Sequence, residues 1–392
     1  MYENQPTRYL FFRDKKNQRQ TRMKQFQGFL IAVFIVTIFN CSSKKAGFTI
    51  KVQLTGIPEG AKMNLQNIST GEFIDSAVVR NGSFSFQGKL MDEPEELRII
   101  SSFKESRFCY TDLLIGNEDV HVKGDFSDFT FNATTTGSPT QDEAQRYYKQ
   151  LNKWNIKLAG LKASLSENAG SSQKQQLELK LTHLRDSLEN WKVNFIKDNF
   201  GTYIGMLLYN YRQDFPVGTL KTLFAATPQT LKESKFGKAI AVQIAHPQLK
   251  PGDTYYEFEA INANGDQYKF SKGDSKYILL QFAGTGCYYS SLSVENMKGI
   301  NSKYKGSVSF VSYFIDANKE SWQTTTAQKD ISWLSLWTPG GKYSEVYNKY
   351  GITGTPTFFI ISPDHKIISR WFGYEDGIIE RELDKAMVHK GP

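Results

Sequence analysis

The stretch that most restricts the fold is an apolar run from Tyr277 to Ala283 that leads into a cysteine. The run YILLQFA contains one polar residue, Gln281, and an apolar run without alternation is typical of a central strand that is covered on both faces. The residues that follow, GTGCYYSSLS, predict a short turn and then a helix that begins at Cys287. The sequence therefore predicts an α/β domain with a cysteine at a junction between strand and helix.

The rest of residues 246–392 supports an α/β domain, because strand and helix patterns alternate after a linker rich in Pro and Gly. The predicted elements are a hairpin around Asn264-Gly265, a strand over 307–315, helices over 287–304, 319–328, 343–350 and 377–388, and a hairpin in TPTFFIISPDHKIISRWFG. Mixed strand pairing with helices on both faces of one sheet is the most economical arrangement of these elements.

Two other regions precede this domain. Residues 47–138 alternate apolar and polar residues between turn signals such as RNGS, which predicts short antiparallel strands in a small all-β sandwich or barrel. Residues 139–245 form a predicted helical region, in which Leu and aromatic residues recur every three or four positions on both sides of ENAGSS. We expect an antiparallel helix hairpin whose apolar stripe is core, followed by helices over 201–211 and 219–234.

The N-terminus has the architecture of a signal peptide. A basic Lys24 precedes an apolar run from Phe26 to Phe39, which is shorter than the about 20 residues that a spanning helix needs. Residues 1–22 do not resemble a leader, so translation is expected to start at Met23. We expect residues 1–40 to be the leader and residues 41–46 a tether. The alternative is an uncleaved signal anchor, which would tether the same domains to the same membrane.

The cysteine directly after the apolar run, Cys41, resembles the lipobox cysteine of bacterial lipoproteins, which is acylated and becomes the first mature residue. Asn40 departs from the usual Gly, Ala or Ser. The resemblance implies that Cys41 anchors the chain in the lipid bilayer. The basic Lys44 and Lys45 favour an anchor that faces the periplasm of a Gram-negative bacterium over export to the cell surface.

The formal charge of +8 does not indicate a nucleic-acid partner. Seven of the 48 Lys and Arg residues lie in residues 1–40 against two acidic residues, so the remainder of the chain is close to balanced. The sequence contains no basic stripe, zinc-finger spacing or RNA-binding motif, and we therefore expect no nucleic-acid binding.

The buried strand, the cysteine at the next helix and, about seventy residues later, GITGTPTFFIIS together resemble the thioredoxin fold of the membrane-tethered TlpA and ResA type. A proline that opens an apolar strand cannot donate to the ladder and needs a special reason to be there. The resemblance implies a cis peptide bond before Pro356 and pairing of the Thr355 backbone with a bound substrate. The alternative is an ordinary trans proline that opens an edge strand. The β-rich region, with its closing TGSPTQDE, resembles the domain that precedes thioredoxin-like domains in Bacteroidetes lipoproteins.

The cysteine motif departs from that family. Where the family has Trp-Cys-x-x-Cys, this chain has Gly286, Cys287, Tyr288, Tyr289 and Ser290, so the second cysteine is a serine. Gln281 replaces the buried acid that thioredoxins often carry, and Ala283 replaces an aromatic residue. The candidate catalytic residues are Cys287 and Ser290, whose hydroxyl can donate to the sulfur; the candidate substrate-binding residues are Thr355, Pro356, Tyr288 and Tyr289.

Two functions remain open at this stage. A thiolate at a helix N-terminus can attack a disulfide, and without a second cysteine it stays attached until another thiol releases it. This predicts mixed-disulfide formation or isomerase-like exchange with disulfide- or thiol-containing envelope proteins. The alternative is a redox-inactive thioredoxin-fold binding module that captures extended segments of envelope proteins, in which Cys287 is incidental.

Other chemistries lack their motifs. Peroxiredoxins place Pro and Thr seven and three residues before the cysteine, where this chain has Leu280 and Gly284. The histidines lack ligand spacing, and we expect no metal site and no cofactor. These histidines are His121, His183, His246, His365 and His389. Cys109 is expected to be a packed or half-exposed thiol in the β-rich region rather than a disulfide partner of Cys287.

Overall fold

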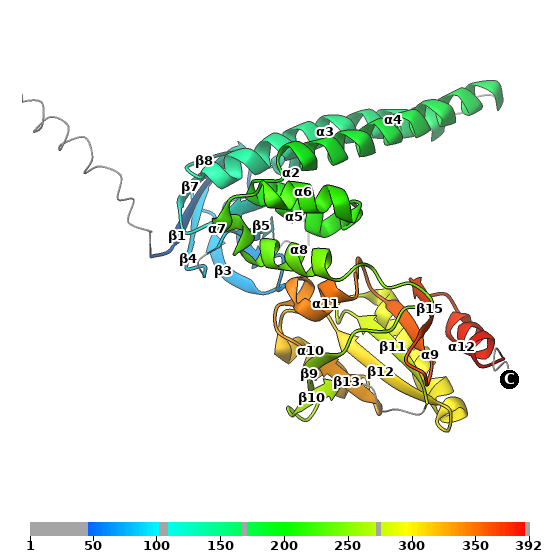
Figure 1. The fold of residues 1–392 in the computed structure, drawn as a ribbon. Coiled ribbons are helices and arrows are strands. Elements are labelled where there is room, and N and C mark those ends of the chain that lie inside the picture. Colours follow the sequence, from blue (N-terminus) through cyan, green and yellow to red (C-terminus); the bar gives the residue numbers. More distant parts are fainter. Residues whose placement is uncertain (1–45, 92, 102–108, 167–170, 272–275, 389–392) are drawn as a thin grey trace, which may run out of the picture. The chain divides into compact units, whose positions relative to one another are not determined.

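The computed structural model of the protein describes residues 46–91, 93–101, 109–166, 171–271 and 276–388. The predicted leader and nearly all of the tether, with Cys41, lie outside these residues. A β-rich, a helical and an α/β region follow one another along the described chain (Figure 1), which confirms the predicted fold class. None of the described helices combines the length and the apolar character that crossing a membrane requires.

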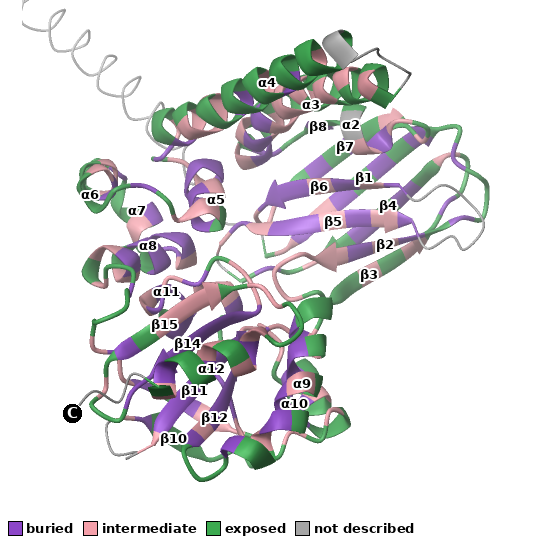
Figure 2. Cartoon of the chain, turned by 90° about the vertical axis from the view of Figure 1, so that its right-hand side faces the viewer, coloured by how far each residue is buried: buried purple, intermediate pink, exposed green. Residues whose placement is uncertain are grey.

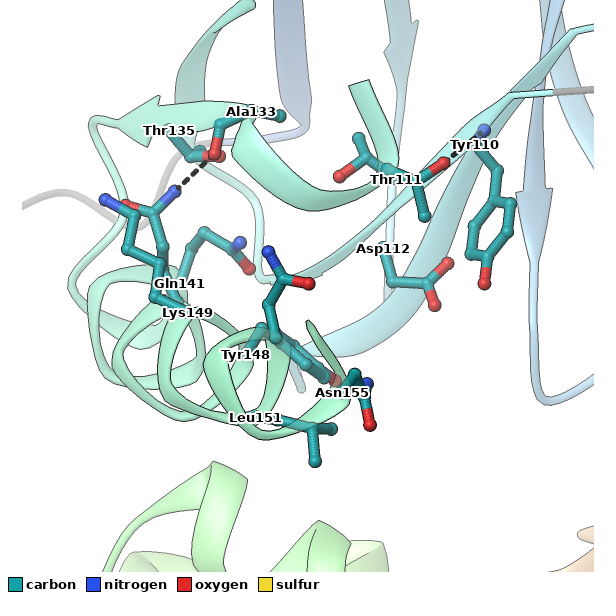
Figure 3. Close-up of a pocket in the computed structure, with 13 residues that line it drawn as sticks. Tyr110, Thr111, Asp112, Ala133, Thr135, Gln141, Tyr148, Lys149, Leu151 and Asn155 are labelled. Atoms are coloured by element: carbon teal, nitrogen blue, oxygen red, sulfur yellow. Dashed lines mark hydrogen bonds between the residues drawn. The ribbon is translucent and has the colours of Figure 1, made fainter. Parts of the chain in front are cut away.

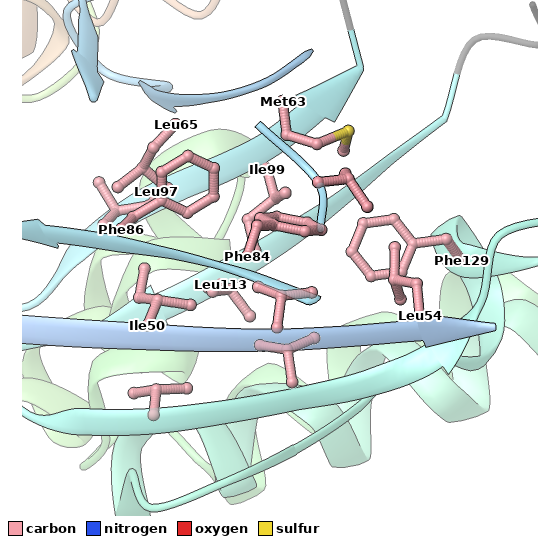
Figure 4. Close-up of a cluster of buried hydrophobic side chains, with 14 of the residues drawn as sticks. Ile50, Leu54, Met63, Leu65, Phe84, Phe86, Leu97, Ile99, Leu113 and Phe129 are labelled. Atoms are coloured by element: carbon pink, nitrogen blue, oxygen red, sulfur yellow. The ribbon is translucent and has the colours of Figure 1, made fainter. Parts of the chain in front are cut away.

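The β-rich region consists of two sheets whose inner faces form one hydrophobic core (Figure 4). One sheet contains, in spatial order, β4 (Ser83–Gly88), β1 (Phe48–Thr55), β7 (Asp119–Asp125) and β8 (Thr134–Thr136); the other contains β3 (Phe73–Val78), β2 (Lys62–Asn67), β5 (Glu95–Ser101) and β6 (Tyr110–Ile115). Buried and more exposed residues alternate along β1, so one face supplies Ile50 and Leu54 to the core. Of the two predicted architectures, the described strands form a sandwich, because they do not close into a barrel.

The prediction of purely antiparallel pairing is wrong for one pair of strands. β7 runs parallel to β1, with Thr49 opposite Asp119 and Thr55 opposite Asp125. The chain reaches β7 only after it has passed through β5 and β6 of the other sheet, so no hairpin fixes the direction of β7. Apolar alternation is the same in both kinds of pairing and carries no information on strand direction. Two short elements, β8 and α2 (Phe129–Asn132), were also not predicted.

The helical region begins with two long helices that pack against each other, α3 (Pro139–Ser166) and α4 (Ser171–Asp198), as predicted. Tyr147 stacks on Trp191 with ring centroids 5.3 Å apart, and Phe195 packs beside both rings. The apolar stripe belongs to the hydrophobic core around these three aromatic residues. Most of the leucines of the stripe are only half-buried.

Shorter helices complete the region: α5 (Tyr203–Arg212), α6 (Val217–Ala225), α7 (Gln229–Lys232) and α8 (Lys235–Ala245). The stretch 219–234 is divided between α6 and α7, because Pro228 has no N–H to donate and is suited to a position before the first helical residue.

The α/β region is built on one mixed sheet with the spatial order β10-β9-β13-β12-β11-β14-β15. Its strands are β9 (Phe258–Asn262), β10 (Gln267–Phe270), β11 (Tyr277–Ala283), β12 (Val308–Phe314), β13 (Leu334–Trp337), β14 (Thr357–Ile361) and β15 (Ile367–Phe372). β11, β12 and β13 are parallel, and the other neighbouring pairs are antiparallel. β13 was not predicted.

Helices cover both faces of this sheet. α9 (Tyr288–Tyr304) and α12 (Ile378–Val388) share a core with Leu279 of β11, whereas α11 (Glu345–Lys349) shares a core with Phe282 of the same strand. α10 (Lys319–Gln328) stacks Trp322 on Trp337. Every residue of β11 is buried (Figure 2), so the apolar run is a central strand as predicted.

We predict that Phe282→Ala lowers the free energy of unfolding by about 3–5 kcal/mol, because the truncation leaves a cavity in a packed core. Phe282 is fully buried and contacts the rings of Tyr313 and Tyr350, with centroids 5.2 and 5.1 Å away. Urea denaturation followed by circular dichroism measures the loss. Tyr268→Ala, at a partly exposed position on β10, is the control, and an equal loss in both variants would contradict this account.

Candidate functional site

Cys287 lies where β11 ends and α9 begins. It is the N-cap residue of α9, with an extended backbone (φ −91°, ψ 116°). Its N–H donates to the Gly284 carbonyl at 3.1 Å, which closes the short turn after β11. The sulfur is partly exposed and lies at the positive end of the helix, where unpaired N–H groups favour an anion.

The proline loop before β14 lies against this cysteine. The Thr355-Pro356 peptide bond is cis, as the resemblance implied. The Cys287 thiol donates to the Thr355 carbonyl, with 3.3 Å between sulfur and oxygen. The two loops approach so closely that a Cβ built on Gly284 would lie 3.2 Å from Thr355 Oγ1. The structure thus brings Cys287 together with Thr355, which lies 68 residues later in the sequence, and with Pro356, the next residue.

Ser290 is nearly fully buried in the first turn of α9, at 2% exposure. Its oxygen accepts a hydrogen bond from the Gly284 N–H at 3.3 Å, and its hydroxyl is hydrogen-bonded to the Cys287 sulfur. The serine therefore joins the turn after β11 to the thiol. Because its hydroxyl is held inside the protein, it acts on the sulfur rather than on solvent.

The pKa of the Cys287 thiol lies below its ordinary value. Burial of the sulfur is the largest single effect and raises the pKa. Hydrogen bonds from the Ser290 hydroxyl and N–H, from the Thr355 side chain and from the Tyr289 N–H lower it, and their sum exceeds the effect of burial. The site therefore favours the thiolate, which is the nucleophilic form of cysteine.

An acid at the end of β12 holds the cysteine loop. Asp316 accepts hydrogen bonds from the Thr285 N–H at 3.0 Å and from the Thr285 hydroxyl at 2.7 Å. Burial raises the pKa of Asp316, while the bonds from Thr285 lower it in part. Our sequence analysis missed this residue. Its position directly after the apolar strand SVSFVSYFI was the signal that could have identified it.

Gln281 replaces the acid of related domains with a neutral buried network. Its Nε2 donates to the Ser293 hydroxyl at 2.7 Å, and its Oε1 accepts from the Ser312 hydroxyl at 2.7 Å. Trp333 donates to the same Ser312 oxygen at 2.9 Å. Both ends of the Gln281 amide are therefore satisfied without an ionisable group.

Exposed aromatic side chains lie at the cysteine turn and at the proline loop. Tyr288 and Tyr289 are 70% and 55% exposed, and their rings meet edge to face with centroids 5.6 Å apart. Phe372, at the end of β15, is 68% exposed and lies against Gly354, where an added Cβ would be 2.6 Å from the Phe372 ring. The sequence analysis missed Phe372, because a residue at the end of a strand shows no pattern that places it beside a distant loop.

The other predicted positions lie away from this site. Cys109 is buried in the core of the β-rich region and is not joined to Cys287 by a disulfide. No group of three or more His, Cys, Asp or Glu side chains in the described part of the chain is arranged to hold a metal ion. His389 and the proposed lipidation residue Cys41 lie outside the described residues.

Two family models match parts of this chain. Residues 48–144 match a domain of unknown function, and residues 274–367 match a thioredoxin-like family. Residues 274–367 form a thioredoxin-like domain. The matched segment of this domain includes Cys287, Thr355 and Pro356. No curated protein matches the sequence.

Similar solved structures include three from Bacteroides. The thioredoxin domain of a thiol-disulfide oxidoreductase from Bacteroides vulgatus is 18% identical, covering 35% of this chain and 98% of that one, with a TM-score of 0.33. A thiol-disulfide oxidoreductase from Bacteroides fragilis is 23% identical, covering 34% and 98%, with a TM-score of 0.31. A thiol:disulfide interchange protein from Bacteroides sp. is 17% identical, covering 35% and 90%, with a TM-score of 0.32.

We predict that Ser290→Ala raises the pKa of Cys287, because the thiolate loses a hydrogen bond from the serine hydroxyl. The pH at which alkylation by iodoacetamide reaches half its maximal rate should move upward, and the rate at pH 7 should fall by about tenfold, as expected for one hydrogen bond to a charged group. Cys41→Ser and Cys109→Ala in the same chain leave Cys287 as the sole cysteine.

The matched control is Ser291→Ala. Ser291 is the next residue of α9, and its backbone N–H, which the substitution retains, donates to the Cys287 carbonyl. An identical pH profile in the Ser290→Ala variant and the parent protein would show that the serine hydroxyl does not stabilise the thiolate.

Proposed function

We propose that this protein carries out thiol-disulfide exchange through Cys287 alone. The observation that carries the proposal is the position of the sulfur, which is partly exposed at the N-terminus of α9 and 3.3 Å from the Thr355 carbonyl. The lowered pKa of this thiol and the thioredoxin-like fold support the same chemistry. A thiolate in such a position is suited to attack a disulfide that reaches the sulfur.

The proposed reaction begins when the Cys287 thiolate attacks one sulfur of a partner disulfide. The new bond joins Cys287 to that sulfur, the old disulfide bond breaks, and the other partner sulfur leaves as a thiolate that takes a proton from water. The partner disulfide is thereby opened, and Cys287 becomes half of a mixed disulfide. No cofactor is needed, because the two electrons stay on the departing partner sulfur.

Release requires a thiol from outside the site. Ser290 occupies the position of the second cysteine, and its hydroxyl is too weak an acid to form the anion that would attack the mixed disulfide. A second thiol of the partner, or a small thiol, must attack the partner sulfur and regenerate the Cys287 thiolate. When the attacking thiol belongs to the partner, the net result is disulfide isomerisation.

We propose that the partner binds as an extended segment along the proline loop. In this arrangement the Thr355 backbone pairs with the partner chain, and Pro356 shapes the groove beside the sulfur. Tyr288 and Tyr289 supply exposed aromatic surface next to the cysteine, and Phe372 supplies it at the proline loop. Aromatic side chains of this kind bury a large area per residue and suit the recognition of a polypeptide.

The place of this chemistry is part of the proposal. The signal-peptide pattern and Cys41 support a lipid anchor in the cell envelope of a Gram-negative bacterium, with the body in the periplasm. Disulfides persist in that compartment. The proposed partners are therefore envelope proteins that contain disulfides or thiols, and the lipid bilayer itself.

A second candidate function, a redox-inactive binding module, is favoured by two observations. Ser290 has replaced the resolving cysteine, and the Gln281 network has replaced the acid of dithiol sites. In this alternative the groove captures extended segments of envelope proteins, and the sulfur forms no covalent bond.

Glutathione disulfide tests the covalent step on the full-length chain with Cys41→Ser and Cys109→Ala. We expect Cys287 to gain the mass of one glutathione, and the adduct to persist until dithiothreitol is added. Ser290→Cys should shorten the lifetime of the adduct at least about tenfold, because a thiol in the same turn attacks as an intramolecular group.

Cys287→Ser in the same background is the matched control and should form no adduct. If the parent chain also forms no adduct, and the Cys287→Ser variant binds the same envelope proteins as the parent chain, the protein is a redox-inactive binding module. An adduct that is equally short-lived with Ser290 and with Cys at this position would contradict the proposed requirement for an external thiol.

A further inference from the structure

A cavity of about 230 Å³ lies in the part of the chain that matches the domain of unknown function and in the helix that follows it. Its walls are β6, α2, β8 and the part of α3 up to Asn155 (Figure 3). Its lining residues lie between 110 and 155, so the cavity is separate from the cysteine site. Nothing in the proposed thiol chemistry uses it.

The first wall of the cavity is the open edge of a sheet. β6 is the last strand in the order β3-β2-β5-β6, so alternate backbone groups of β6 point away from β5. The Tyr110 N–H donates to the Thr130 hydroxyl at 3.3 Å, and the Leu114 N–H donates to Gln141 Oε1 at 2.6 Å. Asp112 lies midway between these two residues and has the same orientation, so its backbone N–H also points outward, into the cavity.

The capped edge excludes one kind of occupant. An added β-strand would need several consecutive outward-facing backbone groups. On both sides of Asp112 the outward-facing N–H groups, those of Tyr110 and Leu114, already donate to Thr130 and Gln141. The opening at Asp112 therefore fits a small polar molecule rather than a polypeptide strand.

The second wall is a row of polar side chains on α3. The side chains of Lys149, Asn152 and Asn155 line the cavity, and none of them makes a hydrogen bond to another group that the structure describes. The Gln145 Nε2 donates to the Ala133 carbonyl at 3.2 Å, which fixes the amide and leaves its oxygen for a ligand. The α3 wall thus offers donors and acceptors from the Gln145, Asn152 and Asn155 amides and donors from the Lys149 ammonium group.

The carboxylate of Asp112 is held in place from behind. Arg98 donates two hydrogen bonds to it, at 2.6 and 2.9 Å, and the guanidinium also lies over the Tyr110 ring at 4.4 Å. Each carboxylate oxygen retains a lone pair that can accept from a ligand hydroxyl. Because Arg98 balances the charge of Asp112 and Lys149 adds a positive charge at the exposed side of the lining, the cavity does not favour a cation.

We propose that this cavity binds one ring of a neutral sugar. A sugar ring presents adjacent hydroxyls, each a donor and an acceptor, which match fixed amide and carboxylate groups. It also presents C–H groups, for which the ring of Tyr148 and the side chain of Leu151 supply an apolar wall. A single ring is comparable in size to the cavity, and the exposed Lys149 and Asn155 mark the side from which it enters.

Saturation-transfer NMR on the full-length protein tests this site with D-glucose, D-galactose, D-mannose and N-acetyl-D-glucosamine as probes. At least one sugar should give a transfer signal that saturates with concentration. Asn152→Ala and Asn155→Ala should each weaken its binding about fivefold, as expected for the loss of one hydrogen bond. Alanine is favourable in a helix, so α3 should remain folded, which circular dichroism checks.

Asn190→Ala is the matched control, because Asn190 is an exposed residue of α4 outside the cavity. It should leave sugar binding unchanged, and so should Cys287→Ser, which separates this site from the proposed thiol chemistry. Absence of a signal from all four sugars would overturn the proposal. So would equal binding in the Asn152, Asn155 and Asn190 variants, or binding of inorganic phosphate or penta-alanine at the cavity in place of the sugars.

Discussion

The contact between the Cys287 sulfur and the Thr355 carbonyl depends on the antiparallel pairing of β11 with β14. Phe282, near the end of β11, lies opposite Thr357, the first residue of β14. The turn before Cys287 and the proline loop therefore both lie at the same end of the sheet. β12 runs parallel to β11 and ends at the same end of the sheet. Asp316, which follows β12, is therefore close enough to accept a hydrogen bond from Thr285.

The sequence predicted those parts of the site that local chemistry marks. A strand buried on both faces must be apolar throughout, so β11 and the cysteine after it were visible without a structure. Pro356 was visible because a proline is unusual at the head of an apolar strand, although its cis geometry came from the resemblance and not from spacing.

Other parts depend on which strands become neighbours, and no local pattern determines this. Asp316 and Phe372 meet the cysteine and proline loops only through the pairing of β12 with β11 and of β15 with β14. The parallel pairing of β7 with β1 was missed for the same reason. β13 was missed because four residues that include Ser335 are too few to show a period.

The neutral hydrogen-bond network of Gln281 is consistent with the proposed chemistry by one thiol. In a dithiol site a buried acid moves the proton of the second cysteine, whose thiolate must form before it attacks. With Ser290 in that position there is no second thiol to deprotonate, and a buried carboxylate would only add the free-energy cost of desolvation. Gln281 fills the same space with both ends of its amide satisfied by Ser293 and Ser312. The replacement of the second cysteine by Ser290 and the replacement of the buried acid by Gln281 therefore have one physical explanation.

The junction with the helical region leaves the cysteine accessible. Gln243 of α8 donates to Asn348 of α11 at 2.7 Å, and Lys342, just before α11, donates to the Tyr211 hydroxyl at 2.7 Å. α11 packs on the face of the sheet that carries Phe282, whereas α9 packs on the opposite face. The contacts with α5 and α8 thus involve the other side of the sheet from α9, and Tyr288 at the start of α9 remains largely exposed. These contacts of the helical region with the thioredoxin-like domain therefore involve neither α9 nor Cys287.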